Sequence, residues 1–128
     1  MTVDLEIICI GNELLIGKVK DTNAHYLAKQ ATKLGANVKR VTVIQDTIQE
    51  ISSSVCEAVA RKTQIIVTTG GLGPTFDDKT LQGIAKAFNR KLEINSEALE
   101  MVRQKCLEYA KKRQLSTEIE LTPPRIKM

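Results

Sequence analysis

A run of β-branched residues, Ile65–Thr69 (IIVTT), passes without a break into the glycine-rich segment Gly70–Thr75 (GGLGPT). A short apolar run that ends in turn residues predicts a buried strand. The glycines leave backbone N–H groups open to a ligand, and a helix that follows adds the positive end of its dipole. We therefore predict a phosphate-binding turn, in which Thr75 caps the next helix and Asp78 completes a capping box. A turn and cap with a purely structural role is the alternative.

Two well-known nucleotide motifs do not match this turn. A Walker A loop needs a lysine followed by serine or threonine at its end, and no lysine stands in that place. A dinucleotide fingerprint needs three glycines; Gly71 and Gly73 fit, but Phe76 occupies the third position. The segment is therefore neither a P-loop nor a Rossmann dinucleotide site.

Two further runs, Leu5–Ile10 and Val38–Ile44, predict strands that alternate along the chain with amphipathic helices. The helices are predicted to begin at Asp21 or Thr22, at Asp46 or Thr47, directly after the glycine turn, and at Ser96. Strands that alternate with helices indicate a three-layer α/β/α fold with a mainly parallel sheet. The length of 128 residues predicts a single domain, 1–128.

Three polar segments follow the three predicted strands. They are Gly11–Glu13, Gln45–Asp46 and the turn that begins at Gly70. Right-handed crossovers bring the carboxyl ends of parallel strands to one edge, and ligands of open α/β sheets bind outside that edge. The strand order alone therefore predicts one crevice lined by all three segments.

Asp77 and Asp78 stand directly behind the predicted phosphate turn. Two carboxylates repel a phosphate unless a cation lies between them, and Mg²⁺ or Mn²⁺ prefers such oxygen ligands. Asp46 and Glu13, from the other two strand ends, could complete the set of ligands. The alternative for Asp77 is a simple charge partner of the helix dipole.

The composition narrows the class of function. The net charge of +4 is scattered, no DNA-binding motif is present, and aromatic residues make up only 3% of the chain, which argues against nucleic-acid binding. No apolar run reaches the roughly 18 residues of a membrane span. Three widely spaced cysteines without a secretory signal predict a cytoplasmic protein with reduced thiols.

Two long segments carry a family resemblance. Gly11–Ala28 (GNELLIGKVKDTNAHYLA) and Thr68–Thr80 (TTGGLGPTFDDKT), with Asp46 between them, resemble the CinA N-terminal domain of the MoaB/Mog molybdopterin-binding superfamily. The resemblance implies the three-layer fold, a pocket at the carboxyl edge of the sheet and a homo-oligomer, either a dimer or a trimer. It implies a nucleotide-like or pterin phosphate ligand, and three functions stay open. These are hydrolysis of an ADP-ribose-type pyrophosphate with Mg, Mn or Co, molybdopterin binding or adenylation, and an inactive ligand-binding or oligomerisation module.

The same resemblance implies roles for individual residues. Asp46 and Asp78 match the acidic positions that we take as catalytic, and Asp77 joins both as a candidate metal ligand. The ligand-binding residues implied are Gly70, Gly71, Leu72, Gly73, Pro74, Thr75, Thr80, Glu13 and Asn23.

The sequence departs from the family pattern in two places. Asn12 stands where the CinA pattern usually has aspartate, which removes one carboxylate. The family continues beyond the segment that resembles Thr122–Met128 into a stretch that helps to close the pocket, so we expect this chain to lack that closing segment. His25, the only histidine, is interpreted as a surface or packing residue rather than a general base.

Overall fold

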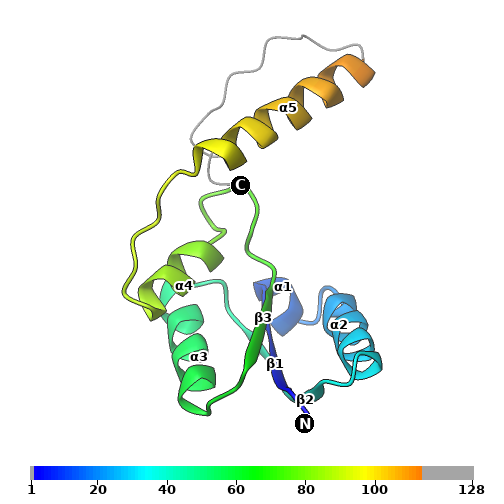
Figure 1. Cartoon of the computed structure of the whole chain (residues 1–128), viewed down its shortest axis with the longest axis vertical. Helices are drawn as coiled ribbons and strands as arrows, with labels where there is room; N and C mark the ends of the chain where they lie inside the picture. Colours follow the sequence, from blue (N-terminus) through cyan, green and yellow to red (C-terminus); the bar gives the residue numbers. More distant parts are fainter. Residues whose placement is uncertain (1, 114–128) are drawn as a thin grey trace.

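The computed structural model describes residues 2–113 of the chain, and the segment Thr122–Met128 lies outside that range. Three parallel strands form one sheet in the order β2-β1-β3, as Figure 1 shows. The strands are β1 (Asp4–Ile10), β2 (Asn37–Ile44) and β3 (Ile65–Thr69). All three were predicted to within one residue, because each combines β-branched residues with clear flanking turns.

Five helices accompany the strands in the described residues. They are α1 (Asn12–Leu15), α2 (Thr22–Lys33), α3 (Ile48–Ala60), α4 (Thr80–Ala87) and α5 (Ser96–Lys112). None of these helices is long and apolar enough to cross a membrane.

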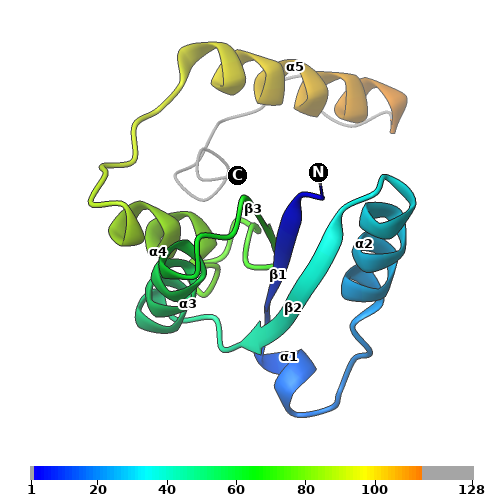
Figure 2. The same ribbon diagram turned by 60° about the horizontal axis from the view of Figure 1, so that its bottom comes forward.

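The central strand β1 separates two apolar clusters, because successive side chains of a strand point to opposite faces. On one face, Ile8 and Ile10 pack with residues of α3 and α4. On the other face, Ile7 and Cys9 pack with residues of α2. Figure 2 shows α2 on one side of the strands and α3 with α4 on the other. The three-layer α/β/α prediction is confirmed.

Most predicted helix starts are correct. Asp21 caps α2 by accepting from the backbone N–H of Ala24, and Thr47 caps α3 by accepting from that of Glu50. The last helix is capped by Asn95 rather than by the predicted Ser96. That helix, α5, stands away from the sheet in Figures 1 and 2.

The predicted start of α4 is wrong. The helix begins at Thr80, not directly after the glycine turn, so Thr75 is not its cap. The reason is that the chain first returns to the turn: Thr80 donates from its hydroxyl to the carbonyl of Gly70 (2.7 Å) and from its N–H to that of Gly71 (3.3 Å). These two bonds close the segment 70–80 into a loop, and helical geometry starts only where the loop ends.

A buried carboxylate stabilises the end of the sheet opposite the glycine turn. Glu6 of β1, whose side chain is 3% exposed, accepts two hydrogen bonds from Arg61 (2.8 and 2.7 Å) and one from Thr63 (2.6 Å). The hydrogen bonds from Arg61 are the main reason that the pKa of Glu6 falls from 4.5 to about 2, against the opposing effect of burial. The end of α3 and the segment before β3 are thereby held against the central strand.

This ion pair predicts a pH dependence of stability. The pKa of Glu6 is lower in the folded chain than in the unfolded one, so its contribution is full above about pH 4.5 and is lost as the pH falls toward 2. We expect urea denaturation to show a loss of up to about 3 kcal/mol from this group across that window. In Glu6→Gln this part of the pH dependence should disappear. An unchanged pH profile in the variant would contradict the assignment.

Candidate functional site

The carboxyl ends of the three strands meet at one edge, as the sequence predicts. The N–H of Gly11, after β1, donates to the carbonyl of Ile44 at the end of β2 (3.1 Å). The side-chain oxygen of Asn12 accepts from the N–H of Asp46 (3.1 Å). The side chain at position 12 thus links the end of β1 to Asp46, a bond that an aspartate at this position could accept equally well.

The glycine turn packs against β1 so tightly that side chains cannot replace its first two glycines. Gly70 has φ +94°, and a β-carbon there would overlap the carbonyl oxygen of Ile10. Gly71 has φ +65°, and a β-carbon there would overlap the hydroxyl of Thr80. The Thr80 side chain is fully buried. Glycine is required here both for the backbone conformation and for the close approach.

Asp46 holds the far end of this loop. Its Oδ1 accepts from the N–H of Lys79 (3.0 Å), the residue that precedes α4. A carboxylate at this position also meets the positive end of the helix dipole. Asp46 is therefore placed beside Gly71 and the start of α4.

Asp78 organises the middle of the loop. Its Oδ2 accepts from the N–H (3.1 Å) and the hydroxyl (2.5 Å) of Thr75. A β-carbon on Gly73 would lie 2.6 Å from the same oxygen, so glycine leaves the space that this carboxylate fills. The predicted pairing of Thr75 with Asp78 thus exists, but it closes a turn within the loop instead of capping a helix. Asp77, the neighbouring residue, is exposed.

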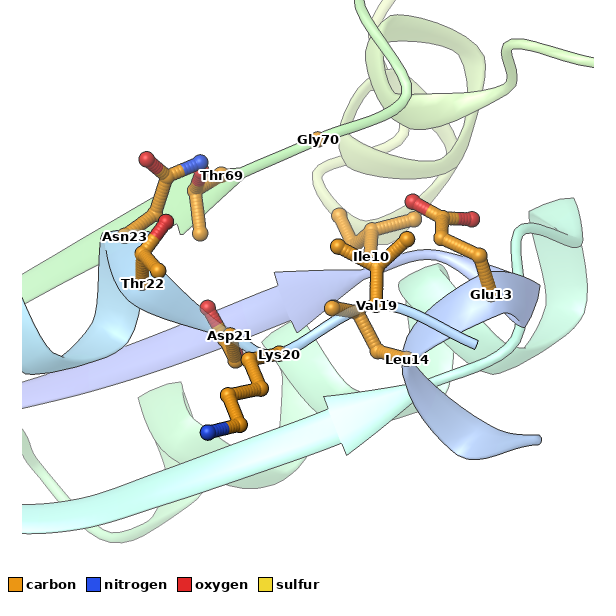
Figure 3. A pocket seen from close by; sticks show the side chains of 10 residues that line it. All are labelled: Ile10, Glu13, Leu14, Val19, Lys20, Asp21, Thr22, Asn23, Thr69 and Gly70. Carbon is orange, nitrogen blue, oxygen red and sulfur yellow. Dashed lines mark hydrogen bonds between the residues drawn. The ribbon is translucent and has the colours of Figure 1, made fainter. Parts of the chain in front are cut away.

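A pocket of about 130 Å³ opens beside the turn, between α1, the start of α2 and the ends of β1 and β3 (Figure 3). Three of the predicted ligand-binding residues line it: Glu13, Asn23 and Gly70. The other predicted residues lie elsewhere in the loop or behind it. The lining residues that the sequence did not indicate are Ile10, Leu14, Val19, Lys20, Asp21, Thr22 and Thr69.

The helix cap in the sequence could have indicated that these residues lie at the site. Most of them belong to the segment between β1 and α2, for which the sequence indicates only a helix start at Asp21 or Thr22. The cap itself places the start of α2 at the pocket, where Asn23 donates from its amide to the hydroxyl of Thr69 (3.1 Å). A helix start that faces the end of a strand is therefore part of the site.

The described residues do not contain a ready-made metal centre. Across residues 2–113, no group of three or more histidine, cysteine, aspartate or glutamate side chains is arranged to hold a metal ion. The predicted set of Asp46, Asp77, Asp78 and Glu13 does not form such a group: Asp46 and Asp78 accept N–H groups of the loop, and Glu13 lines the pocket. The residues present therefore do not fit a resident metal.

The cysteine beneath this edge does not offer a reactive thiol. Cys9 is fully buried, and burial, followed by the nearby carboxylate of Asp21, raises the pKa of its thiol to about 12. A thiol with so high a pKa is a poor nucleophile at neutral pH. His25 is exposed on α2, as the sequence indicated.

Comparison with known proteins identifies the family. A family described as "probable molybdopterin binding domain" matches residues 6–121. The chain belongs to the molybdopterin-binding domain family. Among curated relatives of this domain, a Sulfurisphaera tokodaii protein is 49% identical over 123 residues, which cover 96% of this chain and 44% of that protein. The chain thus spans less than half the length of the curated relatives it matches.

Solved structures place the chain in the CinA-like branch of the molybdopterin-binding domain family. CinA from Thermoplasma acidophilum, a protein described as having unknown function, is 35% identical with a TM-score of 0.82, covering 97% of this chain and 67% of its own. The tungsten cofactor synthesizing protein MoaB from Pyrococcus furiosus is 22% identical with a TM-score of 0.63, covering 88% and 67%. The second likeness supports the fold alone.

The tight packing of Gly70 predicts that alanine substitutions at Gly70 and at Gly35 differ in their effect on stability. Gly70→Ala should destabilise the domain more than Gly35→Ala, because both residues have positive φ but Gly35 has open space around it. The strained φ costs roughly 1–2 kcal/mol at either position, and the overlap with Ile10 adds about 1–3 kcal/mol at Gly70 alone. Urea denaturation of both variants measures the difference. Equal losses would show that Gly70 is not held against β1.

Proposed function

We propose that the domain binds a small molecule that carries a phosphate group at the carboxyl edge of its sheet, with the phosphate against the glycine turn Gly70–Gly73. The observation that supports this most strongly is the construction of the turn. The hydrogen bonds made by Asp46, Asp78 and Thr80 hold the loop in shape, while Leu72 at its tip stays 52% exposed. A loop that is held rigid without a ligand loses little entropy when it binds one.

The pocket beside the turn supplies the second half of the proposed site. It shares Gly70 with the turn and extends between α1 and the start of α2. A ligand that places its phosphate on the turn therefore has room for a second, non-phosphate part next to it. Nucleotide-like and pterin phosphates both carry a heterocyclic ring that could form this second part.

The ligand we favour is a pterin phosphate of the molybdopterin type. The family match supports it, since the family is described by its binding of molybdopterin. Relatives with the same fold include the molybdopterin biosynthesis enzyme MoaB from Thermus thermophilus, at 18% identity and a TM-score of 0.63. Adenylation of the bound pterin is the corresponding reaction.

Hydrolysis of an ADP-ribose-type pyrophosphate is the second candidate. It is favoured by the position in the CinA-like branch and by Asp46 and Asp78, which lie beside two of the turn's glycines. In this proposal both carboxylates keep the phosphates oriented through the loop they organise. Mg²⁺ generally binds through one or two carboxylates and the phosphates of its substrate. Because the described residues do not form a metal centre, metal dependence stays a prediction and no step is routed through the ion.

Two further expectations accompany the proposal. Like the sequence-based prediction, it places the domain in a homo-oligomer, a dimer or a trimer, and in the cytoplasm. The third hypothesis, a module that binds its ligand without turnover, is equally compatible with the rigid turn. The carboxylate that is missing at Asn12 is one reason for this third hypothesis, although the amide oxygen of Asn12 still accepts from the N–H of Asp46.

Calorimetry separates the ligand classes. We expect saturable binding of a pterin phosphate or of ADP-ribose to the full chain, and the ligand that binds more tightly identifies which of the two functions applies.

Turnover of ADP-ribose with Mg²⁺, Mn²⁺ or Co²⁺, and its loss with EDTA, tests the hydrolase. If Asp78 is catalytic, Asp78→Asn should lower turnover at least 100-fold, while the exposed Glu57→Gln should leave it unchanged. Binding of neither ligand class would contradict the proposal.

A further inference from the structure

The charged side chains of the pocket beside the glycine turn are oriented unfavourably for a phosphate. In Figure 3 the side chain of Glu13 extends from α1 toward Ile10 and the Gly70 turn, whereas the amino group of Lys20 points away from these residues. A negative group therefore faces the space and the positive group does not. A phosphate in this pocket would be repelled by Glu13, and by Asp21 at its rim.

Gly11 explains how the carboxylate of Glu13 reaches this position. A β-carbon at residue 11 would lie 2.6 Å from Oε1 of Glu13 and 3.0 Å from Oε2. The φ of Gly11 is 168°, which is extended backbone that any residue adopts. The glycine is therefore needed for space rather than for conformation: it lets the carboxylate lie directly over the backbone at the end of β1.

Beside Glu13 the pocket wall is part aliphatic and part polar, with Asp21, Asn23 and Thr69 among its polar lining residues. Ile10, Leu14 and Val19 contribute apolar side chains to the lining. A cavity of about 150 Å³ accommodates a benzene molecule, so this pocket of about 130 Å³, which is open to solvent, is close to the size of a single six-membered ring. Within residues 2–113 the Glu13 carboxylate accepts no hydrogen bond, so its two oxygens are available to a ligand.

Two carboxylates line the pocket, but Asp21 already caps α2 by accepting from the N–H of Ala24, so Glu13 is the one that we pair with a bound ring. An ionised carboxylate only accepts hydrogen bonds, and its two oxygens are best matched by two parallel N–H donors. A heterocycle offers this pair where a ring N–H stands beside an exocyclic amino group. The 2-amino-4-oxo-pyrimidine edge of guanine and of pterins has this arrangement, whereas adenine does not combine a ring N–H with its amino group.

We propose that Glu13 is the residue that determines ring specificity, and that it selects a heterocycle with a 2-amino-4-oxo-pyrimidine edge. The ring N–H and the amino group donate to the two carboxylate oxygens, and Gly11 keeps the space in which the carboxylate lies. This inference rests on the proposed function, because the phosphate of the same ligand lies on the glycine turn. It assigns the two halves of the site to two different parts of one ligand.

Matched pairs of ligands test this directly on the full chain by calorimetry. GMP and IMP differ only in the 2-amino group; 6-hydroxymethylpterin phosphate and its lumazine counterpart differ by an oxygen in place of that group. We expect the amino-bearing member of at least one pair to bind about tenfold more tightly, because its partner leaves a carboxylate oxygen unpaired. The pair that discriminates identifies the source of the ring as guanine or pterin. Inorganic pyrophosphate serves as a probe of the glycine turn alone.

Two variants assign the discrimination to Glu13. Glu13→Gln keeps the shape but replaces one acceptor by a donor, and Gly11→Ala displaces the carboxylate without removing a polar group. Both should abolish the preference within the pair while pyrophosphate binding stays unchanged, and Glu57→Gln should behave like the wild type. Circular dichroism melting checks that the variants fold.

The outcomes separate this inference from the proposed function. If pyrophosphate binds but neither pair discriminates, or if Glu13→Gln keeps the preference, ring selection by Glu13 is overturned and the phosphate site stands. If no phosphate compound binds at all, the proposed function fails and ring selection fails with it.

Discussion

The contact between the glycine turn and the end of the central strand determines the shape of this site. Gly70 reaches the carbonyl of Ile10 more closely than any residue with a side chain can. The close approach fixes where β3 leaves the sheet, and the bonds from Thr80 to the carbonyls of Gly70 and Gly71 then fix where α4 begins. Loop, helix start and pocket wall therefore follow from one packing constraint.

The acidic residues behind the turn have a structural role in addition to any role in catalysis. Asp46 and Asp78 each accept backbone N–H groups of the loop, so their first task is to hold its shape. Such charge-assisted hydrogen bonds are stronger than neutral ones, which suits a loop that contains three glycines and would otherwise be flexible. A role in catalysis would be added to this structural role and does not replace it.

The sequence predicted the fold well because its signals are local. Strand Ile65–Thr69 and the cap at Asp21 depend on residue types and spacing that neighbours in the chain decide. The prediction failed at Thr75, where the outcome depends on bonds between Thr80 and residues nine and ten positions away. It also placed the pocket too narrowly around the turn, because the orientations of Glu13 and Lys20 depend on the packing of α1 and α2 against the strands.

The central claim is that a phosphate binds on the glycine turn at the carboxyl edge of the sheet. Amide NMR spectra of the ¹⁵N-labelled chain, titrated with inorganic pyrophosphate, test it most directly. The account predicts shifts of the N–H signals of Gly70, Gly71 and Gly73, with the signals around Glu6 and Arg61 at the opposite edge unchanged. Saturable shifts confined to any other part of the chain, or no shifts at millimolar pyrophosphate, would contradict it.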